Sequence, residues 1–407
     1  MLINLTPLKK YPDYRNLFMG QLVSFLGTMV SYVAIPYQVY EITKSSFYVG
    51  LLGTVQLVPV LLFGLLGGSV ADSMDRRKLI LISEAVMCVA CWVLMANAML
   101  STPSVWVIFA ATALLQAANG FHRPAMEAMT QKIVSSEDYP AVGVLNSFRY
   151  TFAAVSGPAL GGLIIATYGA RAAYIFDFLT FVFAMYTIWK IRQMPVAKNS
   201  RRPGIESIKE GLRYAWRKPE LMGTYIIDIV AMTFAFPVAL FPAMGAAWGG
   251  AQATGALYSA MAIGSLITTL TSGWSSKVLR HGRAVVISAA GWGFAVILLG
   301  YAPSLWFAVA CLVVAGASDM ISALFRGVIW NETVPNEMRG RLAGIEMISY
   351  MTGPLLGNTR AGWMASVTSN QMSIVSGGIL CVIGVLICGF ALPQFWRYKS
   401  TKAGSTI

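Results

Sequence analysis

Charged side chains are scarce in this sequence of 407 residues. Asp, Glu, Lys and Arg make up 12% of the chain, whereas a soluble globular protein contains about one quarter. Uncharged stretches recur from end to end, for example at 100–122 and 284–318. Apolar runs of at least ~18 residues are typical of membrane-spanning helices. The scarcity of charge therefore excludes a conventional water-soluble core and predicts a chain embedded in a lipid bilayer.

Histidine and the sequence motifs of enzymes are almost absent. The two histidines are His122 and His281, and the chain contains no His-Glu-x-x-His, Gly-x-Ser-x-Gly or nucleotide-binding Gly-x-x-x-x-Gly-Lys-Ser/Thr motif. Cys88 and Cys91 form a Cys-x-x-Cys pair, but no second ligand pair follows at the spacing of a zinc site. We therefore expect no catalytic residue, no metal, no cofactor and no ATP hydrolysis. A membrane receptor or scaffold without transport activity stays an alternative.

Basic residues outnumber acidic ones and give a net charge of +13. They gather in alternate connectors between the apolar stretches, for example Arg76, Arg77 and Lys78 in one connector and Arg201 and Arg202 in another. This distribution follows the positive-inside rule of membrane proteins. It predicts that both termini lie in the cytoplasm. No basic patch carries interleaved aromatic residues, so we expect no nucleic-acid partner.

Twelve apolar stretches are long enough to cross the hydrocarbon core, which takes about 20 helical residues. The sequence therefore predicts an all-α integral membrane protein with twelve transmembrane helices. Their expected ranges are 15–42, 47–72, 78–100, 104–132, 138–168, 171–192, 220–247, 252–277, 283–301, 304–332, 338–367 and 371–396.

The longest polar interruption divides the twelve stretches into two sets of six. We expect an N-terminal bundle at 1–192, a cytoplasmic linker at 193–219, and a C-terminal bundle with a short cytoplasmic tail at 220–407. The linker sequence IESIKEGLRYAW favours an amphipathic helix on the membrane surface over an irregular segment. Both sets repeat one order of features: a basic residue, an acidic turn and a Gly-Pro pair. Repeated halves around a central site are typical of secondary transporters.

The connector between the second and third predicted helices reads GGSVADSMDRRK. It resembles the signature of the major facilitator superfamily at this position. The resemblance implies that Asp72, Arg76 and Arg77 join a charge network that latches the outward-facing state. Asp75 stands where the family usually has a glycine. In the fifth helix, AAVSGPALGG with Gly157 and Pro158 resembles the Gly-Pro signature of exporters and antiporters in that superfamily.

A closer resemblance runs along most of the chain. The segments NLTPLKKYPDYRNLFMGQLVSFLG, VAIPYQVYEITKSSFYVGLLG and TGALYSAMAIGSLITTLTSG are similar to segments of bacterial enterobactin exporters, a branch that adjoins the macrolide-efflux transporters. The resemblance implies a monomeric proton-coupled exporter of a siderophore or similar bulky amphipathic compound, working by alternating access. Its partners would be a small-molecule substrate, protons and the bilayer of the bacterial inner membrane. A multidrug or macrolide efflux antiporter is the alternative.

Acidic residues inside the predicted helices are candidates for proton coupling, because ionisable groups at membrane depth cost several kcal/mol. Burial disfavours the charged form of a carboxyl and so allows it to take up and release a proton. We expect Asp228 or Asp319 to be the coupling carboxylate, with Asp177 as a further candidate. Arg149 either attracts an anionic or catechol-bearing substrate or neutralises Asp177; the sequence leaves both open.

Other polar and aromatic residues fall on predicted cavity faces or in local charge pairs. A bulky amphipathic ligand favours a large apolar pocket with few polar groups. The candidates for substrate contact besides Arg149 are Tyr32, Gln38, Gln116, Asn119, Asn146 and Phe236. We expect structural ion pairs between Arg123 and Glu127, four residues apart, and between Arg326 and Glu332. Glu84 and Glu346 are expected to extend towards the basic connectors.

Overall fold

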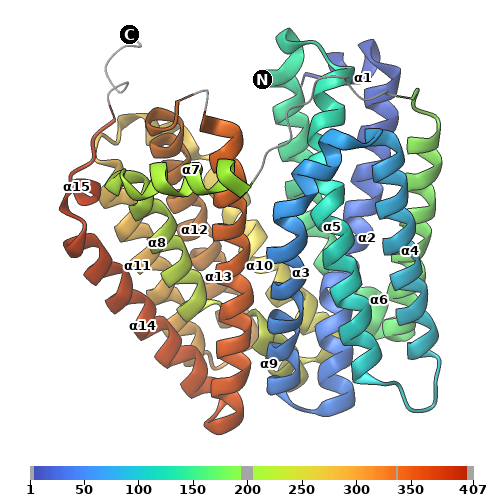
Figure 1. Cartoon of the computed structure of the whole chain (residues 1–407). Helices are drawn as coiled ribbons and strands as arrows, with labels where there is room; N and C mark the ends of the chain where they lie inside the picture. Colours follow the sequence, from blue (N-terminus) through green and yellow to red (C-terminus); the bar gives the residue numbers. More distant parts are fainter. Residues whose placement is uncertain (1–3, 194–204, 336–337, 401–407) are drawn as a thin grey trace. The chain divides into compact units, whose positions relative to one another are not determined.

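Helices make up nearly all of the structure (Figure 1). The computed structural model describes residues 4–193, 205–335 and 338–400; the side chains of 65–69, 71–73, 205–209, 340–341 and 343–344 lie outside the description. Within the described residues there is no strand, and ten helical segments are long and apolar enough to cross a membrane. The prediction of an all-α integral membrane protein is confirmed.

The chain forms two compact units. Unit 1 consists of Met1–Lys44, Val58–Pro203 and Gly249–Ser259, and unit 2 of Ser45–Leu57, Gly204–Trp248 and Ala260–Ile407. Helix α3 (Ser46–Ser73) and helix α10 (Gly250–Leu270) therefore each contribute residues to both units. The domain boundaries expected at residues 192 and 219 remain a prediction, since 194–204 lie outside the described residues.

Unit 1 is built around two long helices that pack along each other, α2 and α6. Helix α4 packs against both α5 and α6. The elements of this unit are α1 (Thr6–Lys10), α2 (Pro12–Thr43), the later part of α3, α4 (Arg76–Ala98), α5 (Val105–Ile133), η1 (Ser136–Asp138), α6 (Tyr139–Trp189) and the start of α10.

Two predicted membrane spans, 138–168 and 171–192, are joined in α6. The chain reverses at Gly169, whose φ of 79° and ψ of 171° interrupt the helical backbone. Only glycine adopts this conformation without a steric penalty from Cβ. The second stretch of α6 therefore carries Asp177 back through the unit, against α2 and α4.

Unit 2 centres on α8 and α11, which pack against each other and against α12 and α14. Helix α13 packs on α8 and α14. The elements are the start of α3, α7 (Ile205–Trp216), α8 (Pro219–Ala235), η2 (Val238–Leu240), α9 (Phe241–Trp248), the later part of α10, η3 (Ser272–Lys277), α11 (His281–Gly300), α12 (Leu305–Thr333), α13 (Arg339–Val367), α14 (Asn370–Ala391) and α15 (Pro393–Trp396).

The membrane span predicted at 220–247 agrees with a candidate span at Pro219–Trp248, but its helix breaks after Ala235. Pro237 has no N–H to continue the hydrogen-bond ladder. Broken helices are tolerated in membranes only where other groups satisfy the freed backbone. Here Trp292 Nε1 donates to the Ala235 carbonyl at 3.1 Å, and Asn358 Oδ1 accepts from the Ala239 N–H at 3.0 Å. The predicted helix at 252–277 also ends early, at Leu270, where a short 3₁₀ helix follows.

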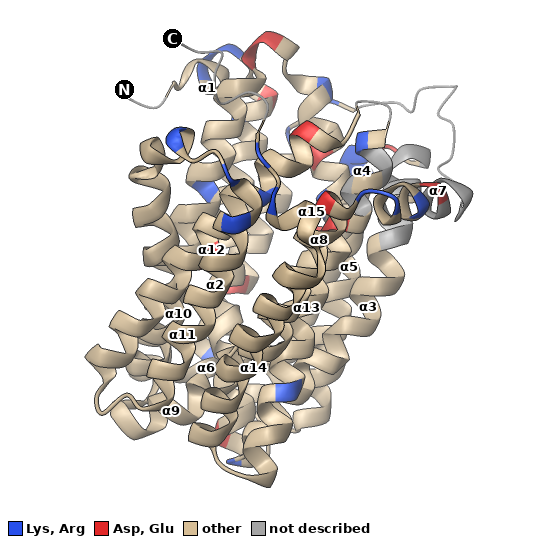
Figure 2. Cartoon of the chain, turned by 90° about the vertical axis from the view of Figure 1, so that its left-hand side faces the viewer, with Lys and Arg blue, Asp and Glu red and all other residues tan. Residues whose placement is uncertain are grey.

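Charged residues lie mainly at helix ends and in connectors, and the middles of the helices contain few of them (Figure 2). At one such helix end in unit 1, Lys10 Nζ and the Tyr11 hydroxyl each donate a hydrogen bond to Asp138 Oδ2 at 2.8 Å. The hydrogen bond to Asp138 raises the pKa of Lys10 above its ordinary value. The few charged groups in the helix middles therefore stand out as candidates for function.

Candidate functional site in unit 2

Three helices of unit 2 bring acidic groups to a single arginine. Arg326 of α12 forms an ion pair through Nη1 with Asp228 Oδ1 of α8. Its Nη2 lies 3.7 Å from Asp319 Oδ1, on its own helix. Asp319 and Arg326 share a helix face because seven residues make close to two turns. Asp319 is the middle residue of α12, so the cluster lies deep between the helix ends.

Glu346 of α13 adds a third carboxyl to this group. It interacts electrostatically with both Arg326 and Asp228. We expected Glu346 to extend towards the basic connectors, and the structure places it against this cluster instead. The sequence could not show this, because the packing of α13 on α8 decides which residues face each other. We call Asp228, Asp319, Glu346 and Arg326 the acid cluster.

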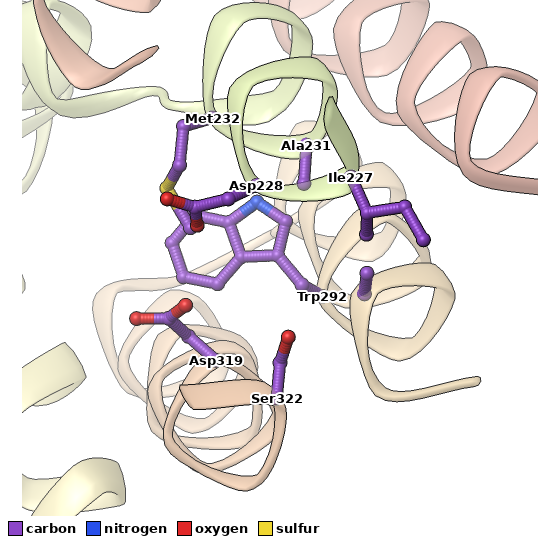
Figure 3. A pocket seen from close by; sticks show the side chains of 8 residues that line it. Ile227, Asp228, Ala231, Met232, Trp292, Asp319 and Ser322 are labelled. Atoms are coloured by element: carbon purple, nitrogen blue, oxygen red, sulfur yellow. The ribbon is translucent and has the colours of Figure 1, made fainter. Parts of the chain in front are cut away.

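A small cavity adjoins the acid cluster, with about 10 Å³ of space for a water-sized sphere, roughly enough for one water molecule. Figure 3 shows the carboxyls of Asp228 and Asp319 approaching from two helices beside the indole of Trp292. The lining residues are Ile227, Asp228, Ala231, Met232, Ala289, Trp292, Asp319 and Ser322. Pockets for drug-sized ligands span about 300–1,000 Å³. This cavity therefore suits a proton or water better than a bulky organic compound.

The charges of the acid cluster do not balance if every acid is ionised. Among the described residues, Arg326 is the one basic group that pairs or interacts with these three carboxyls. Three carboxylates beside one guanidinium would leave a net charge of about −2 in a mostly buried place. Like charges that share a site do not all ionise together, and such groups titrate as a coupled set. The arrangement can thus hold at least one proton and exchange it.

Asp177 occupies a separate buried place in unit 1. Its side chain is 1% exposed. The Ser31 hydroxyl and the Cys91 thiol both donate to Oδ2, the thiol from 3.2 Å, and the Thr180 hydroxyl lies 3.3 Å from Oδ1. Arg149 is not among these partners. The structure therefore does not support the alternative in which Arg149 neutralises Asp177.

Glu84 forms a second polar centre in unit 1, and sequence reasoning missed it. The residue is fully buried, not directed to the basic connectors as expected. Gln21 Nε2 donates to Glu84 Oε1 at 2.8 Å, and His122 Nε2 lies 3.0 Å from the same oxygen. The available signal was the polar face of α2, where Gln21, Ser24 and Ser31 recur at helical spacing.

The predicted substrate residues fall in both units, most of them in unit 1. Gln38 is buried and accepts a hydrogen bond from the Tyr174 hydroxyl at 2.7 Å. Tyr32 is partly exposed and contacts the ring of Tyr258 edge-on. Phe236, in unit 2, stacks on Trp292. The remaining candidates are half-buried Gln116, Asn146 and Arg149 and exposed Asn119.

Arg149 of α6 is the one predicted substrate residue that carries a charge. It is half-buried, and its Nε has no hydrogen-bond partner among the described residues. It interacts electrostatically with Tyr14 and Arg123. A guanidinium with an unused donor can bind an anionic or phenolic group of a ligand.

The connector after α3, which resembles the superfamily signature, is only partly described. The side chain of Asp72 lies outside the described residues. Arg77 donates to the carbonyls of Ile188 and Trp189 at the end of α6. Asp75 caps α4 by accepting from the N–H groups of Arg77 and Lys78. An aspartate in place of glycine therefore fits this connector as a helix N-cap.

Gly157 and Pro158 lie where α6 meets other helices of unit 1. A methyl group on Gly157 would approach the Leu26 carbonyl oxygen to 3.3 Å, so glycine allows α6 to lie close against α2. A methyl group on Gly255 of α10 would lie 2.6 Å from the Pro158 carbonyl oxygen. Small residues permit this kind of close helix packing in membranes.

The expected pairing of Arg326 with Glu332 is wrong. Glu332 instead accepts hydrogen bonds from Tyr398 at 2.8 Å and from Ser400, beyond the last helix. Arg123 Nε lies 3.7 Å from Glu127 Oε1, with both side chains at least half exposed. The described residues contain no group of three or more His, Cys, Asp or Glu that could hold a metal ion.

Comparisons with known proteins agree on one family. The sequence profile of the transmembrane secretion effectors, within the major facilitator superfamily, matches residues 3–403. The enterobactin exporter EntS of Escherichia coli O1:K1 is 27% identical over 407 residues, covering 98% of this chain and 96% of that protein. The EntS of Salmonella typhi is 28% identical over 408 residues, covering 98% and 97%.

Solved transporter structures share the fold. A mutant of the nucleoside transporter NupG superposes with a TM-score of 0.75 at 12% identity, covering 95% of this chain and all of that one. A bacterial homologue of the lysosomal transporter Spinster gives 0.71 at 14% identity, with 96% of each chain covered. The chain is therefore a member of the transmembrane secretion effector family, a multi-span membrane transporter of the major facilitator superfamily and not an enzyme.

Proposed function

We propose that this transporter is a proton-coupled exporter of a siderophore or a similar bulky amphipathic compound. The observation that carries the coupling is the acid cluster, in which Asp228, Asp319 and Glu346 share Arg326. The enterobactin exporters that match nearly the whole chain support the substrate class. The protein acts as a monomer in the bacterial inner membrane, with both termini in the cytoplasm and no nucleic-acid partner.

Proton coupling follows from the surplus of acids over bases. Asp228 keeps the direct ion pair with Arg326, while Asp319 is the more exposed acid, at 36% of its side chain against 7%. Asp319 therefore takes up a proton when the site faces the outside and releases it when the site faces the cytoplasm. Ionisation of Asp319 draws the Arg326 side chain towards Asp319, on its own helix, and away from Asp228 of α8. Alternating access then couples inward proton flow to outward substrate movement.

The substrate contacts lie away from the acid cluster in this proposal, because the cavity there is too small for a siderophore. Arg149 supplies a half-buried cation with an unused donor. Catechol and carboxylate groups of siderophores match such a donor. Tyr32, Asn119 and Asn146 offer further aromatic and amide surface in unit 1. Arg149 thus selects electron-rich oxygen groups on the cargo.

The proposal is tested in a bacterium that makes enterobactin but lacks its own exporter. Expression of the chain should restore enterobactin in the medium, and a protonophore should abolish the effect without lowering the cell's enterobactin content. Restored macrolide resistance with no change in secreted enterobactin would overturn the siderophore assignment in favour of drug efflux. Export that persists after the proton gradient is collapsed would overturn proton coupling.

A further inference from the structure

A buried carboxyl and a buried imidazole meet in unit 1, well away from the acid cluster in sequence. Glu84 of α4 is fully buried and His122 of α5 is 8% exposed. Glu84 Oε1 lies 3.0 Å from His122 Nε2, and Gln21 Nε2 of α2 lies 2.8 Å and 3.3 Å from these two atoms. The Ser24 hydroxyl donates to Glu84 Oε2 at 3.4 Å. Three helices thus enclose one acid–base pair.

The geometry admits two protonation states without movement of heavy atoms. In one, His122 Nε2–H donates to an ionised Glu84. In the other, a protonated Glu84 donates to the bare Nε2, the imidazole proton lies on Nδ1, and the Gln21 amide donates to the carboxyl. The first state has a net charge of −1 when the imidazole is neutral, and the second has no charge. Uptake of one proton at Nδ1, with transfer of the Nε2 proton to Glu84, therefore converts the first state into the second.

Burial makes the choice between these states sensitive to the surroundings. The groups that face Glu84 are Gln21 and Ser24 on α2, His122 on α5, Cys88 on its own helix, and Asp177 on α6. None of these is a permanent cation. An isolated carboxylate is costly in a dry interior. A change in solvation or in the Asp177 charge is then enough to shift the proton.

The position of the pair along α4 places it inside the membrane. Glu84 lies eight residues after the first residue of α4, Arg76, which is about 12 Å along the helix at 1.5 Å per residue. Asp177 lies on the returning stretch of α6. Its carboxyl contacts the same polar face of α2, because it accepts a hydrogen bond from Ser31. Ser24 and Ser31 are seven residues apart on that helix, so the buried acids Glu84 and Asp177 contact one helix face.

We propose that Glu84 and His122 form a second proton-binding site, one that takes up a single exchangeable proton within unit 1. In the loaded state the proton lies on the Glu84 carboxyl, and His122 Nε2 accepts its hydrogen bond. In the unloaded state the carboxyl proton has moved to His122 Nε2, the proton on Nδ1 has left to water, and Nε2–H donates to the carboxylate. The role of this proton in export depends on the proposed function, whereas the existence of the site does not.

Infrared difference spectroscopy of the purified full-length protein tests the site directly. A protonated carboxyl gives a carbonyl band that a carboxylate lacks. We expect the pH-dependent carbonyl signal to lose one component in Glu84→Gln, and we expect that component to shift in frequency in His122→Gln. Glu137→Gln, a change to an exposed acid in η1, should leave the component in place. A Glu84→Gln spectrum equal to that of the wild type at every pH would overturn the proposal.

Transport assays separate this inference from the proposed function. In proteoliposomes, Glu84→Gln should keep enterobactin exchange without a pH gradient and lose accumulation driven by the gradient. The His122→Gln variant, whose Glu84 keeps its carboxyl, should shift the pH at which driven transport is half-maximal. Equal loss of exchange and driven transport in both variants, with unchanged spectra, would contradict a proton-binding role. If wild-type transport shows no coupling to protons, the spectra still decide whether the site exists.

Discussion

Arg326 fixes the electrostatics of unit 2 at the scale of single residues. Its guanidinium pairs with Asp228, lies near Asp319 and interacts with Glu346. Removing one partner of a buried ion pair is costly, because it leaves the other charge without compensation. Removing both partners is much less costly. Variants at Arg326 and Asp228 can therefore show how far this pair supports the fold.

Arg326→Met should lower the free energy of unfolding by about 3–5 kcal/mol, the usual cost of orphaning a buried charge. Asp228→Asn in the same chain should recover part of that loss, because one orphaned carboxylate disappears. Thermal unfolding in detergent measures both. The control is Arg123→Met, which breaks an exposed pair with Glu127 and should cost less than about 1 kcal/mol. Equal losses at both arginines would contradict a buried, charge-compensating role for Arg326.

At the scale of elements, helix crossings in unit 2 depend on small residues. A methyl group on Gly316 of α12 would lie 2.7 Å from the carbonyl carbon of Met261 in α10, closer than atoms pack. The Ser265 hydroxyl also bridges the two helices by donating to the Gly316 carbonyl at 3.1 Å. Backbone contact and an interhelical hydrogen bond thus hold α10 against α12.

Gly316→Ala should therefore destabilise the protein, by about 1–3 kcal/mol as expected for overpacking. Gly327→Ala is the matched control on the same helix, because no atom lies within 4 Å of a methyl group there. That change should be neutral or stabilising by up to about 1 kcal/mol, since alanine favours helix over glycine. Equal changes in the unfolding temperature of the two variants would contradict a stabilising role for the close α10–α12 contact.

The break between α8 and α9 gives a second prediction at this scale. Asn358 Oδ1 is the acceptor for the Ala239 N–H, so Asn358→Leu leaves a backbone donor unsatisfied. The expected loss is about 1–3 kcal/mol, the penalty for a buried donor without a partner. Asn331→Leu, at an exposed position on α12, should change stability little. An Asn358 variant as stable as the Asn331 variant would contradict the role assigned to the hydrogen bond.

At the scale of the whole molecule, hydropathy and charge predicted the helical membrane architecture well. Apolar runs set where helices lie, because a span must satisfy its backbone internally. They did not predict the break after Ala235, which depends on partners from α11 and α13. Asp228 and Asp319 stood out as isolated acids, but Glu84 and His122 did not, because only the packing of α4 against α5 brings them together.

The central claim concerns the transporter as a whole: proton movement through the acid cluster drives export. It is tested most directly in proteoliposomes of the purified protein, with an imposed pH gradient and enterobactin as the transported compound. We predict that Asp319→Asn abolishes gradient-driven transport but keeps enterobactin exchange without a gradient. Glu137→Asn, at an exposed acid, should behave as the wild type. Full gradient-driven transport in Asp319→Asn, and equally in Asp228→Asn, would contradict the account.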